Sequence, residues 1–472
     1  MGTQRGARCT DAARRAGPPP WTDERGRRDH GVGRTRRAIA HRDAGHQRCR
    51  RADGPAVSAR GGGRGPTGAE GVTVLGDLKR DAEKRGLLTA PGFIDLHAHL
   101  REPGFEESET IATGSRAALA GGFTTICAMP NTEPAIDSPG LVAELIARGE
   151  AARAARVLPI AAITRGRNGK ELADLVELAA AGAVAFSDDG SPVADARLFR
   201  NALEYARAAG RPILEHPQDL TLSAGGVMHE GVVSARLGLP GMPAAAEESA
   251  VARDLALAKL TGGRLHLSHL STAGAVELVR HAKAGGLAVS AEVTPHHLAL
   301  TDEWVAGSRA LAWEDGGPRV APFHTATKVN PPLRTAADVR ACWAGLMDGT
   351  IDAIATDHAP HASIRKDVEY QEAAFGISVF ETAIPLLLAG VAAGWGTWER
   401  VVGALTAGPA RVLGIELPKN DLVVIDPKVA WTPTATSLRS LGKNTPLLGR
   451  SLTGRVVAAV VDGELRHELA LA

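Results

Sequence analysis

The chain has 472 residues, of which 44% are apolar and 4% aromatic, and its formal net charge is +1. This length accommodates two domains, or one large domain with an accessory one, around a sizeable core. The balanced charge argues against a general attraction to nucleic acid or anionic membranes, and no apolar run is long enough to span a bilayer. Because the four cysteines are scattered and no secretory signal opens the chain, we expect a reduced, cytoplasmic protein.

Residues 1–75 form an arginine-rich segment that differs from the rest of the chain. Residues 1–70 contain no lysine and show no apolar period of 2 or 3.6 residues, so they do not build a core. We expect this segment to be disordered, or to be non-native through a wrong start site or a shifted reading frame. A basic nucleic-acid tail and an organelle-targeting peptide are the alternatives, although the acidic residues argue against the second. Only GVTVLG (71–76) resembles a short strand.

From about residue 88, short apolar runs rich in β-branched residues alternate with helical stretches that end in glycines. The runs cover residues 87–100, 124–131, 157–164, 183–190, 212–219, 264–271, 287–297 and 351–360. Strand–helix alternation predicts parallel strands, and eight such units predict a (β/α)₈ barrel over residues 88–414. An open doubly wound sheet is the structural alternative.

The alternation of short apolar runs with helical stretches ends at about residue 415. DLVVIDP (421–427) and VVAAVVDGELRHE (456–468) have the composition of strands. The second contains an Asp-Gly step suited to a tight hairpin turn. We therefore expect residues 415–472 to form a small β domain beside the barrel.

Polar side chains end nearly every run of the predicted barrel. They are His97 and His99, Asn131, Asp189, His216, His269, His296 and His297, and Asp357. In a barrel these strand ends converge on one face, where active sites lie. A single histidine here would most often be a hydrogen-bonded core residue. A whole layer of unpaired ligand-type residues would cost several kcal/mol, which bound metal would remove.

Six of these residues suggest a two-metal site. Residues i and i+2 of a strand share a face, so His97 and His99 converge, and imidazole is a common metal ligand. The ligands divide into His97, His99 and Asp357 for one ion, His216 and His269 for the other, and Asp189 as the bridge. Two-metal hydrolytic sites hold their ions about 3.5–4 Å apart and lower the pKa of bound water towards about 7. We expect Asp357 to act as general acid/base in hydrolysis or formation of an amide-like bond.

A cation follows the first pair of histidines. Arg101 is two residues beyond His99, so it points into the same mouth if the extended backbone continues. A guanidinium there suits bidentate capture of a carboxylate, whereas a surface ion pair would contribute little. Asn131 could complete the clamp, although Pro-Asn-Thr is also ordinary turn chemistry. We therefore expect a substrate that carries a carboxylate beside the reacting amide.

Seven motifs together resemble the dihydroorotases of the amidohydrolase superfamily, in the bacterial class with a bridging aspartate. They are GFIDLHAHLREPG, MPNTEPAID, FSDDG, LSHLS, EVTPHHLALT, NPPLR and IATDHAPH. The resemblance covers roughly residues 88–470. It implies a (β/α)₈ barrel with two Zn²⁺ ions that reversibly closes N-carbamoyl-L-aspartate to L-dihydroorotate in de novo pyrimidine (UMP) biosynthesis.

The resemblance also implies roles for single residues. Its metal ligands match His97, His99, Asp189, His216, His269 and Asp357, with Asp189 bridging and Asp357 as general acid/base. Its substrate contacts match His99, Arg101, Asn131, Asn330, His361, Phe375 and Gly376. Asp188 would be a neighbouring or capping group.

Two departures from the family pattern affect these expectations. Pro217 and Gln218 follow His216, where the family usually has a small residue or cysteine and then glutamate. A backbone donor and a charge are thereby lost, so we expect a weaker second metal site. An extra stretch, about 305–328, lies at the active-site end, and we expect it to be an insertion without a role rather than a lid.

Two other functions stay open at this stage. One is a different cyclic amidohydrolase: a hydantoinase, dihydropyrimidinase or allantoinase. Hydantoinases bridge their metals with a carboxylated lysine, and AVAFSDDG (183–190) has no lysine. The other is a non-catalytic partner of aspartate transcarbamoylase, against which the retained ligand set argues. Besides the small-molecule substrate, a homo-oligomer and an association with aspartate transcarbamoylase are the partners considered, and neither nucleic acid nor membrane is expected.

Overall fold

The computed structural model describes residues 68–469, so residues 1–67 lie outside it and their disorder or non-native origin stays a prediction. Residues 68–75 belong to helix α1 (Gly68–Arg85). The interpretation of GVTVLG (71–76) as a strand is therefore wrong. Leu75, Leu78 and Ala82 recur at helical spacing and pack against the C-terminal sheet, which favours the helix over a strand.

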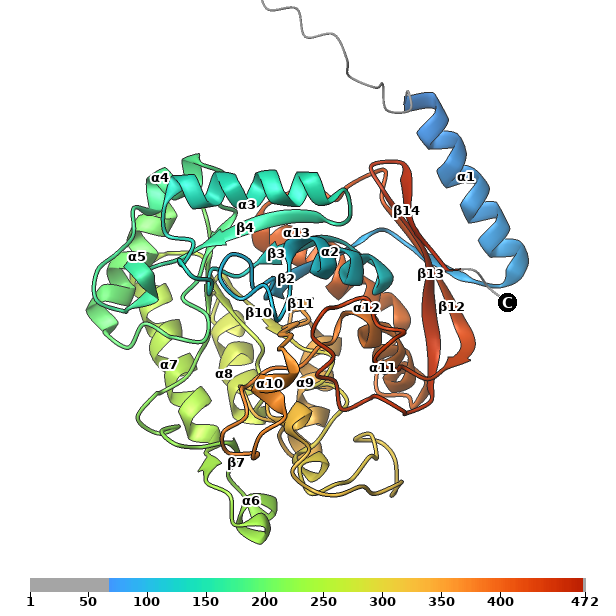
Figure 1. Ribbon diagram of the computed structural model, residues 1–472. Helices are drawn as coiled ribbons and strands as arrows, with labels where there is room; N and C mark the ends of the chain where they lie inside the picture. The colour runs from blue at the N-terminus through green and yellow to red at the C-terminus, as the bar shows by residue number, and fades with distance from the viewer. Residues whose placement is uncertain (1–67, 470–472) are drawn as a thin grey trace, which may run out of the picture. The chain divides into compact units, whose positions relative to one another are not determined.

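Eight parallel strands form the central sheet, in the spatial order β11-β10-β9-β6-β5-β4-β3-β2. They are β2 (Phe93–Ala98), β3 (Phe123–Ala128), β4 (Arg156–Ala161), β5 (Ala185–Phe186), β6 (Ile213–Glu215), β9 (Leu265–Leu267), β10 (Val289–Val293) and β11 (Ala353–Ile354). A parallel bridge joins Ala98 to His358, and the His99 amide donates to the His358 carbonyl at 2.8 Å. The sheet is thus a nearly closed barrel (Figure 1), which confirms the (β/α)₈ prediction and excludes the open sheet.

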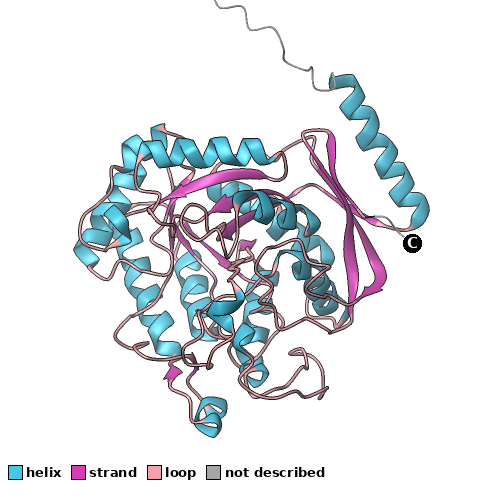
Figure 2. Ribbon diagram, in the orientation of Figure 1, coloured by secondary structure: helices cyan, strands magenta, loops and turns pink. Residues whose placement is uncertain are grey.

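Helices surround the barrel strands (Figure 2). They are α2 (Ile111–Ala120), α3 (Pro139–Ala152), α4 (Leu175–Ala180), α5 (Ala196–Ala208), α7 (Ala244–Thr261), α8 (Ala273–Ala284), α9 (Ala336–Asp348), α11 (Phe380–Ala392), α12 (Trp398–Leu405) and α13 (Ala407–Leu413). Thr110 and Thr272 cap α2 and α8 through their side chains, while Gly262 and Gly349 end α7 and α9 with positive φ. The main core lies between strands and helices, where Phe123 of β3 meets Phe380 of α11 at 5.6 Å between ring centroids.

A separate antiparallel sheet has the order β1-β12-β13-β14. Its strands are β1 (Leu88–Ala90), β12 (Leu422–Trp431), β13 (Leu452–Val461) and β14 (Glu464–Glu468). Asp462 and Gly463, with φ of 53° and 83°, form the tight turn that the Asp-Gly step predicted. Because β1 pairs with β12, the run 87–100 contributes to both sheets before it enters the barrel.

Shorter elements occupy the long connections at the active-site end. They are β7 (Met228–His229), α6 (Val232–Leu237), β8 (Gly241–Met242) and α10 (Ser363–Lys366). The stretch 305–328 packs against its surroundings: Trp313 meets Trp395 at 5.6 Å, and Glu314 accepts a hydrogen bond from Arg450 at 2.7 Å. Within residues 68–469, every helix is too short or too polar to cross a membrane.

Candidate metal centre and substrate pocket

His97, His99 and Asp357 meet where strands β2 and β11 end. His99 Nε2 lies 3.0 Å from Asp357 Oδ1, and His97 Nε2 lies 3.5 Å from the same oxygen. All three side chains are buried. Each offers one ligand atom, and these atoms lie within 4.8 Å of one another. The three residues can therefore hold one metal ion, as the sequence predicted for this set.

Asp189, which follows β5, faces four histidines. Its Oδ1 lies 3.3 Å from His97 Nε2, 3.3 Å from His216 Nδ1 and 3.5 Å from His269 Nε2. Its Oδ2 lies 3.5 Å from His99 Nε2. His97, Asp189 and His269 form a second group with metal-ligand geometry. The two groups share His97, and His216, predicted as a ligand, lies outside both, so the bridging role of Asp189 stays a prediction.

Several polar atoms of this cluster are buried without a partner. Among the residues that the structure describes, His97 Nε2 and both ring nitrogens of His269 make no hydrogen bond. An unsatisfied buried polar atom costs about 1–3 kcal/mol. Imidazole nitrogens together with carboxylate oxygens are the donors that zinc and related divalent ions bind. The residues present thus fit the metal that the sequence implied.

The electrostatics of the cluster also favour a bound cation. Burial alone would raise the pKa of Asp357, but nearby His97 and His99 outweigh it and hold that pKa below its usual value. Burial alone would lower the pKa of His97, but Asp189 and Asp357 outweigh it and raise that pKa well above normal. The two carboxylates therefore stabilise positive charge at the point where the ligand atoms converge.

Glu292 in β10 orients His97 from below the cluster. Its Oε1 lies 3.1 Å from His97 Nδ1, and its Oε2 lies 3.0 Å from His266 Nε2. Burial opposes ionisation of Glu292, but the hydrogen bonds from His266 and His97 lower its pKa to about 2. An ionised Glu292 accepts the His97 Nδ1–H, so that Nε2 is directed at the metal ligands. The sequence did not indicate this role, because the predicted run 287–297 ends at His296 and His297, whereas β10 ends at Val293, directly after Glu292.

Asn131 makes a second contact of this kind. Its Oδ1 lies 2.8 Å from His99 Nδ1, which directs His99 Nε2 at Asp357. From its position in the sequence, Asn131 could complete a carboxylate clamp with Arg101. In the structure its carbonyl oxygen is engaged by His99, so its amide nitrogen is the group that remains to meet a substrate.

Gln218 and Asn330 hold the other side of His216. His216 Nε2 lies 2.7 Å from Gln218 Oε1, and Asn330 Nδ2 donates to the same oxygen at 2.8 Å. Because Gln218 occupies Nε2, His216 presents Nδ1 to Asp189. Gln218, one of the departures from the family pattern, therefore selects the nitrogen with which His216 can bind a metal.

Of the neighbouring polar residues, Asp188 and His297 have hydrogen-bond partners of their own, whereas neither ring nitrogen of His296 makes a hydrogen bond within the described part of the chain. Asp188 accepts hydrogen bonds from the Ile163 amide at 2.8 Å and from the Thr164 hydroxyl, so it is a capping group as expected. His297 contacts Thr294 Oγ1 at 2.8 Å and the Pro331 carbonyl at 3.1 Å. His296 is fully buried, and burial lowers its pKa to about 4. These residues surround the cluster without joining either ligand group.

The expectation that Arg101 continues an extended strand is wrong. Its φ is 63°, in the left-handed region, because the chain turns sharply and the Glu102 amide donates to the Leu100 carbonyl at 2.7 Å. His269 and Asp357 are also left-handed, with φ of 35° and 47°. Non-glycine residues adopt this conformation at a cost, and strained residues of this kind often cluster at active sites.

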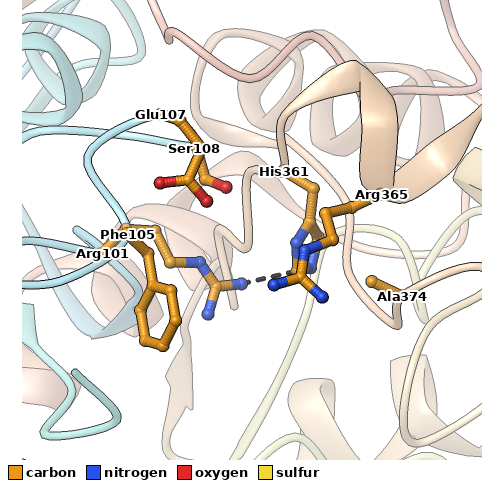
Figure 3. A pocket seen from close by; sticks show the side chains of 7 residues that line it. All are labelled: Arg101, Phe105, Glu107, Ser108, His361, Arg365 and Ala374. Carbon is orange, nitrogen blue, oxygen red and sulfur yellow. Dashed lines mark hydrogen bonds between the residues drawn. The ribbon is translucent and has the colours of Figure 1, made fainter. Parts of the chain in front are cut away.

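The Arg101 side chain nevertheless reaches the predicted mouth. It lines a cavity of about 150 Å³ together with Phe105, Ser108, His361 and Arg365 (Figure 3). Arg101 Nε donates to the Pro360 carbonyl at 3.1 Å. Burial lowers the pKa of Arg101 to about 10, so the guanidinium is charged at neutral pH. The cavity, which Glu107 also lines, therefore offers a partly buried cation to an anionic group.

His361, in the loop after β11, lies between Arg101 and Phe375. Its Nε2 lies 2.7 Å from the Phe375 carbonyl and 3.3 Å from Arg101 Nη2. A carbonyl only accepts, so the shorter contact favours the Nε2–H tautomer. Burial, together with Arg101, lowers the pKa of His361 to about 3, and the ring is neutral at pH 7. At Gly376, with φ of 139°, a Cβ would lie 2.7 Å from the Ala359 carbonyl, so only glycine fits.

Comparison with known proteins identifies the family. A family model described as dihydro-orotase-like matches residues 86–275. A dihydroorotase from Anaeromyxobacter sp. (strain K) is 52% identical over 395 residues, which cover 82% of this chain and 88% of that protein. The chain belongs to the dihydroorotase family. A dihydroorotase from Pelotomaculum thermopropionicum is 51% identical over 389 residues, covering 80% of this chain and 87% of that protein.

Solved structures agree with this assignment at the level of the fold. An L-hydantoinase (dihydropyrimidinase) from Arthrobacter aurescens superposes with a TM-score of 0.70 at 26% identity, covering 81% of this chain and 86% of that chain. A D-hydantoinase from Thermus sp. gives a TM-score of 0.63 at 23% identity, covering 81% and 85%. The protein is therefore an enzyme of the cyclic-amide hydrolase class, and the much higher identity to dihydroorotases favours their activity over that of the hydantoinases.

Proposed function

We propose that the protein is a zinc-dependent dihydroorotase that interconverts N-carbamoyl-L-aspartate and L-dihydroorotate in pyrimidine biosynthesis. The convergence of two metal-ligand groups near Asp189, together with the partly buried guanidinium of Arg101 in the adjoining loop, carries this proposal. Dihydroorotate has a cyclic amide and one carboxylate. The metal-ligand cluster suits the amide, and the Arg101 guanidinium suits the carboxylate. Dihydrouracil has the same ring without the carboxylate and would leave Arg101 without a ligand.

The metal ligands are proposed in two sets with one shared carboxylate: His97, His99 and Asp357; His216 and His269; and Asp189 between them. When bound, two Zn²⁺ ions would polarise the reacting carbonyl as Lewis acids and activate water for attack. Glu292 and Asn131 hold His97 and His99 with Nε2 towards the metal side. Gln218 holds His216 with Nδ1 in the same direction.

Asp357 is the proposed general acid/base. In the hydrolytic direction it accepts a proton as water attacks the ring carbonyl carbon. The bond from this carbon to the ring nitrogen then breaks, the nitrogen keeps the electron pair, and Asp357 returns the proton to it. The carbonyl carbon becomes a carboxylate and one proton is released to solvent. Cyclisation follows the same steps in reverse.

Arg101 is the proposed partner of the substrate carboxylate that does not react. A guanidinium binds a carboxylate with two parallel hydrogen bonds, which fixes orientation as well as position. The other proposed substrate contacts are His99, Asn131, Asn330, His361, Phe375 and Gly376. His361 and Gly376 lie at the same end of the site as Arg101, since His361 contacts both Arg101 and Phe375.

A matched pair of substrates tests the proposal. The purified protein should open L-dihydroorotate and close N-carbamoyl-L-aspartate, should lose both activities on zinc removal, and should recover them with Zn²⁺. Dihydrouracil should be turned over at least about 100-fold less efficiently, because the Arg101 cation then stays unpaired. Equal turnover of the two rings would contradict the substrate assignment, and a zinc-loaded but inactive protein would favour the non-catalytic partner. Cytoplasmic location, self-association and binding to aspartate transcarbamoylase stay predictions for fractionation and size-exclusion measurements.

A further inference from the structure

Asn444 belongs to the connection between β12 and β13, yet its side chain is buried at the mouth of the barrel, with 8% of the residue exposed. Its Oδ1 accepts hydrogen bonds from the His361 amide at 2.8 Å and from Ser378 Oγ at 3.0 Å. Its Nδ2 donates to the Ala359 carbonyl at 3.1 Å and to the Gly376 carbonyl at 3.0 Å. The carboxamide thus uses both of its donors and both acceptor positions.

The four hydrogen bonds join two backbone segments of the proposed substrate pocket. One segment is residues 359–361, which follow β11 and carry His361. The other is residues 375–378, which carry Phe375 and Gly376. The two segments also contact each other directly, since the Ala359 amide donates to the Ile377 carbonyl at 2.8 Å. Asn444 spans them from the side of the C-terminal sheet and sets the spacing between their backbones.

The connection around Asn444 is itself held firmly against these segments. Ser378 N donates to the Asn444 carbonyl at 3.1 Å. The single Ser378 Oγ proton is shared between Asn444 Oδ1 and the Gly442 carbonyl, which lies 2.8 Å from Oγ. A Cβ on Gly442 would lie 2.6 Å from the His361 amide nitrogen, so only glycine allows this approach. Further along, Ser440 Oγ donates to Glu109 Oε2 at 2.5 Å. The C-terminal region is thus docked on the active-site face.

We propose that Asn444 is a positioning residue for the end of the substrate that carries the unreacting carboxylate. It fixes the backbones of His361 and Gly376, and through His361 it fixes the surroundings of Arg101. This inference rests on the proposed substrate contacts. The Asn444 side chain forms its hydrogen bonds with His361, Ser378, Ala359 and Gly376 and with none of the proposed metal ligands, so its loss should weaken substrate binding and leave metal binding and the chemical step almost unchanged.

The test compares Asn444→Ala and Asn444→Asp with the wild-type enzyme. Alanine removes all four hydrogen bonds, while aspartate removes only the two donated by Nδ2 and places an oxygen against two carbonyl oxygens. Both variants should raise KM for L-dihydroorotate by about tenfold or more, with kcat changed by less than about threefold and zinc content unchanged. An unchanged KM, or a loss confined to kcat, would overturn the proposal.

Two further sets of variants separate positioning from a general loss of stability. Ser440→Ala loosens the same connection by removing the contacts of Ser440 Oγ with Glu109 and His358, while the hydrogen bonds of residues 359–361 are kept. Asn420→Asp changes an exposed asparagine next to the C-terminal sheet. Both should keep KM within about twofold. If Ser440→Ala raises KM as much as Asn444→Ala does, and lowers Tm by the same amount, the effect would come from looser docking of the β12–β13 connection and not from the hydrogen bonds of Asn444. If Asn444→Ala does not fold, the milder Ser378→Ala should still raise KM, and an unaltered KM there would count against the proposal.

A double variant tests the route of the effect. In a His361→Ala background, Asn444→Ala should raise KM by a smaller factor than it does alone, because part of its effect passes through His361. If the increase in KM of the double variant equals the product of the increases of the two single variants, the effect of Asn444 does not pass through His361. If wild-type protein shows no dihydroorotase activity, the proposed function fails; if wild type and Arg101→Ala behave as proposed and Asn444→Ala does not, only the positioning role fails.

Discussion

Replacing Glu292 with glutamine should weaken zinc binding and leave the barrel folded. Glu292 is fully buried, and each of its carboxylate oxygens contacts one imidazole, at 3.1 Å for His97 and 3.0 Å for His266. Glutamine has nearly the same shape but only one accepting oxygen. That oxygen must face His97 Nδ1, because His97 Nε2 is needed on the metal side.

The glutamine amide would then face His266, which can adapt. The other nitrogen of His266 lies 2.8 Å from Ser290 Oγ, and a hydroxyl can donate or accept, so His266 can change tautomer. No buried polar atom is left without a partner, and the loss is confined to the negative charge that makes His97 a stronger ligand. Changes to such outer partners typically cost about 10–100-fold in metal affinity, or roughly 1.4–2.8 kcal/mol.

Competition with a chromogenic chelator measures this loss as a zinc dissociation constant, alongside Tm. Ser290→Ala is the matched control: it removes the outer contact of His266 but keeps the Glu292–His97 pair, and its zinc affinity should stay within about threefold of wild type. Wild-type zinc affinity in Glu292→Gln would refute the reasoning. An equal loss in Ser290→Ala would show that His266, and not the carboxylate charge, controls the site.

The remaining predictions concern the proposed ligands and substrate contacts. Asp357→Asn should lower kcat by at least about 100-fold while zinc is retained, and unchanged turnover would rule out its acid/base role. Arg101→Ala should raise KM for L-dihydroorotate by about 10–100-fold, with partial rescue by added guanidinium, and it should shrink the preference over dihydrouracil; a preserved preference would disprove the clamp. Asp189→Ala should reduce bound zinc below that of wild type by elemental analysis, and two tightly held ions in this variant would speak against a bridge.

The barrel and its metal cluster could be predicted because both follow from short-range patterns. Alternating strands and helices specify parallel strands, and parallel strands in a barrel end on one rim. His97, His99, Asp189, His269 and Asp357 all lie at or just beyond the carboxyl ends of predicted strands. The barrel alone therefore predicts that their side chains are close together. The Asp-Gly turn at 462–463 was predictable for a similar reason, since its backbone conformation is a local property.

Features that depend on contacts across long stretches of chain could not be predicted. Glu292 was not predicted because the predicted run 287–297 ends at His296 and His297, whereas β10 ends at Val293. Asn444 lies about 80 residues after His361, and no local pattern links the two. GVTVLG (71–76) contains β-branched residues that are typical of a strand. It is helical because the following turns of α1 pack on the C-terminal sheet, and this contact outweighs the local preference. Arg101 departs from the strand because a tight turn follows Leu100.

Anomalous diffraction at the zinc edge, from crystals of protein that turns over L-dihydroorotate, tests the central claim most directly. The account predicts two peaks at the carboxyl ends of the barrel strands: one among His97, His99 and Asp357, the other beside His216 and His269, with Asp189 in contact with both. Active protein with no zinc at this rim, or with its zinc bound elsewhere, would contradict it.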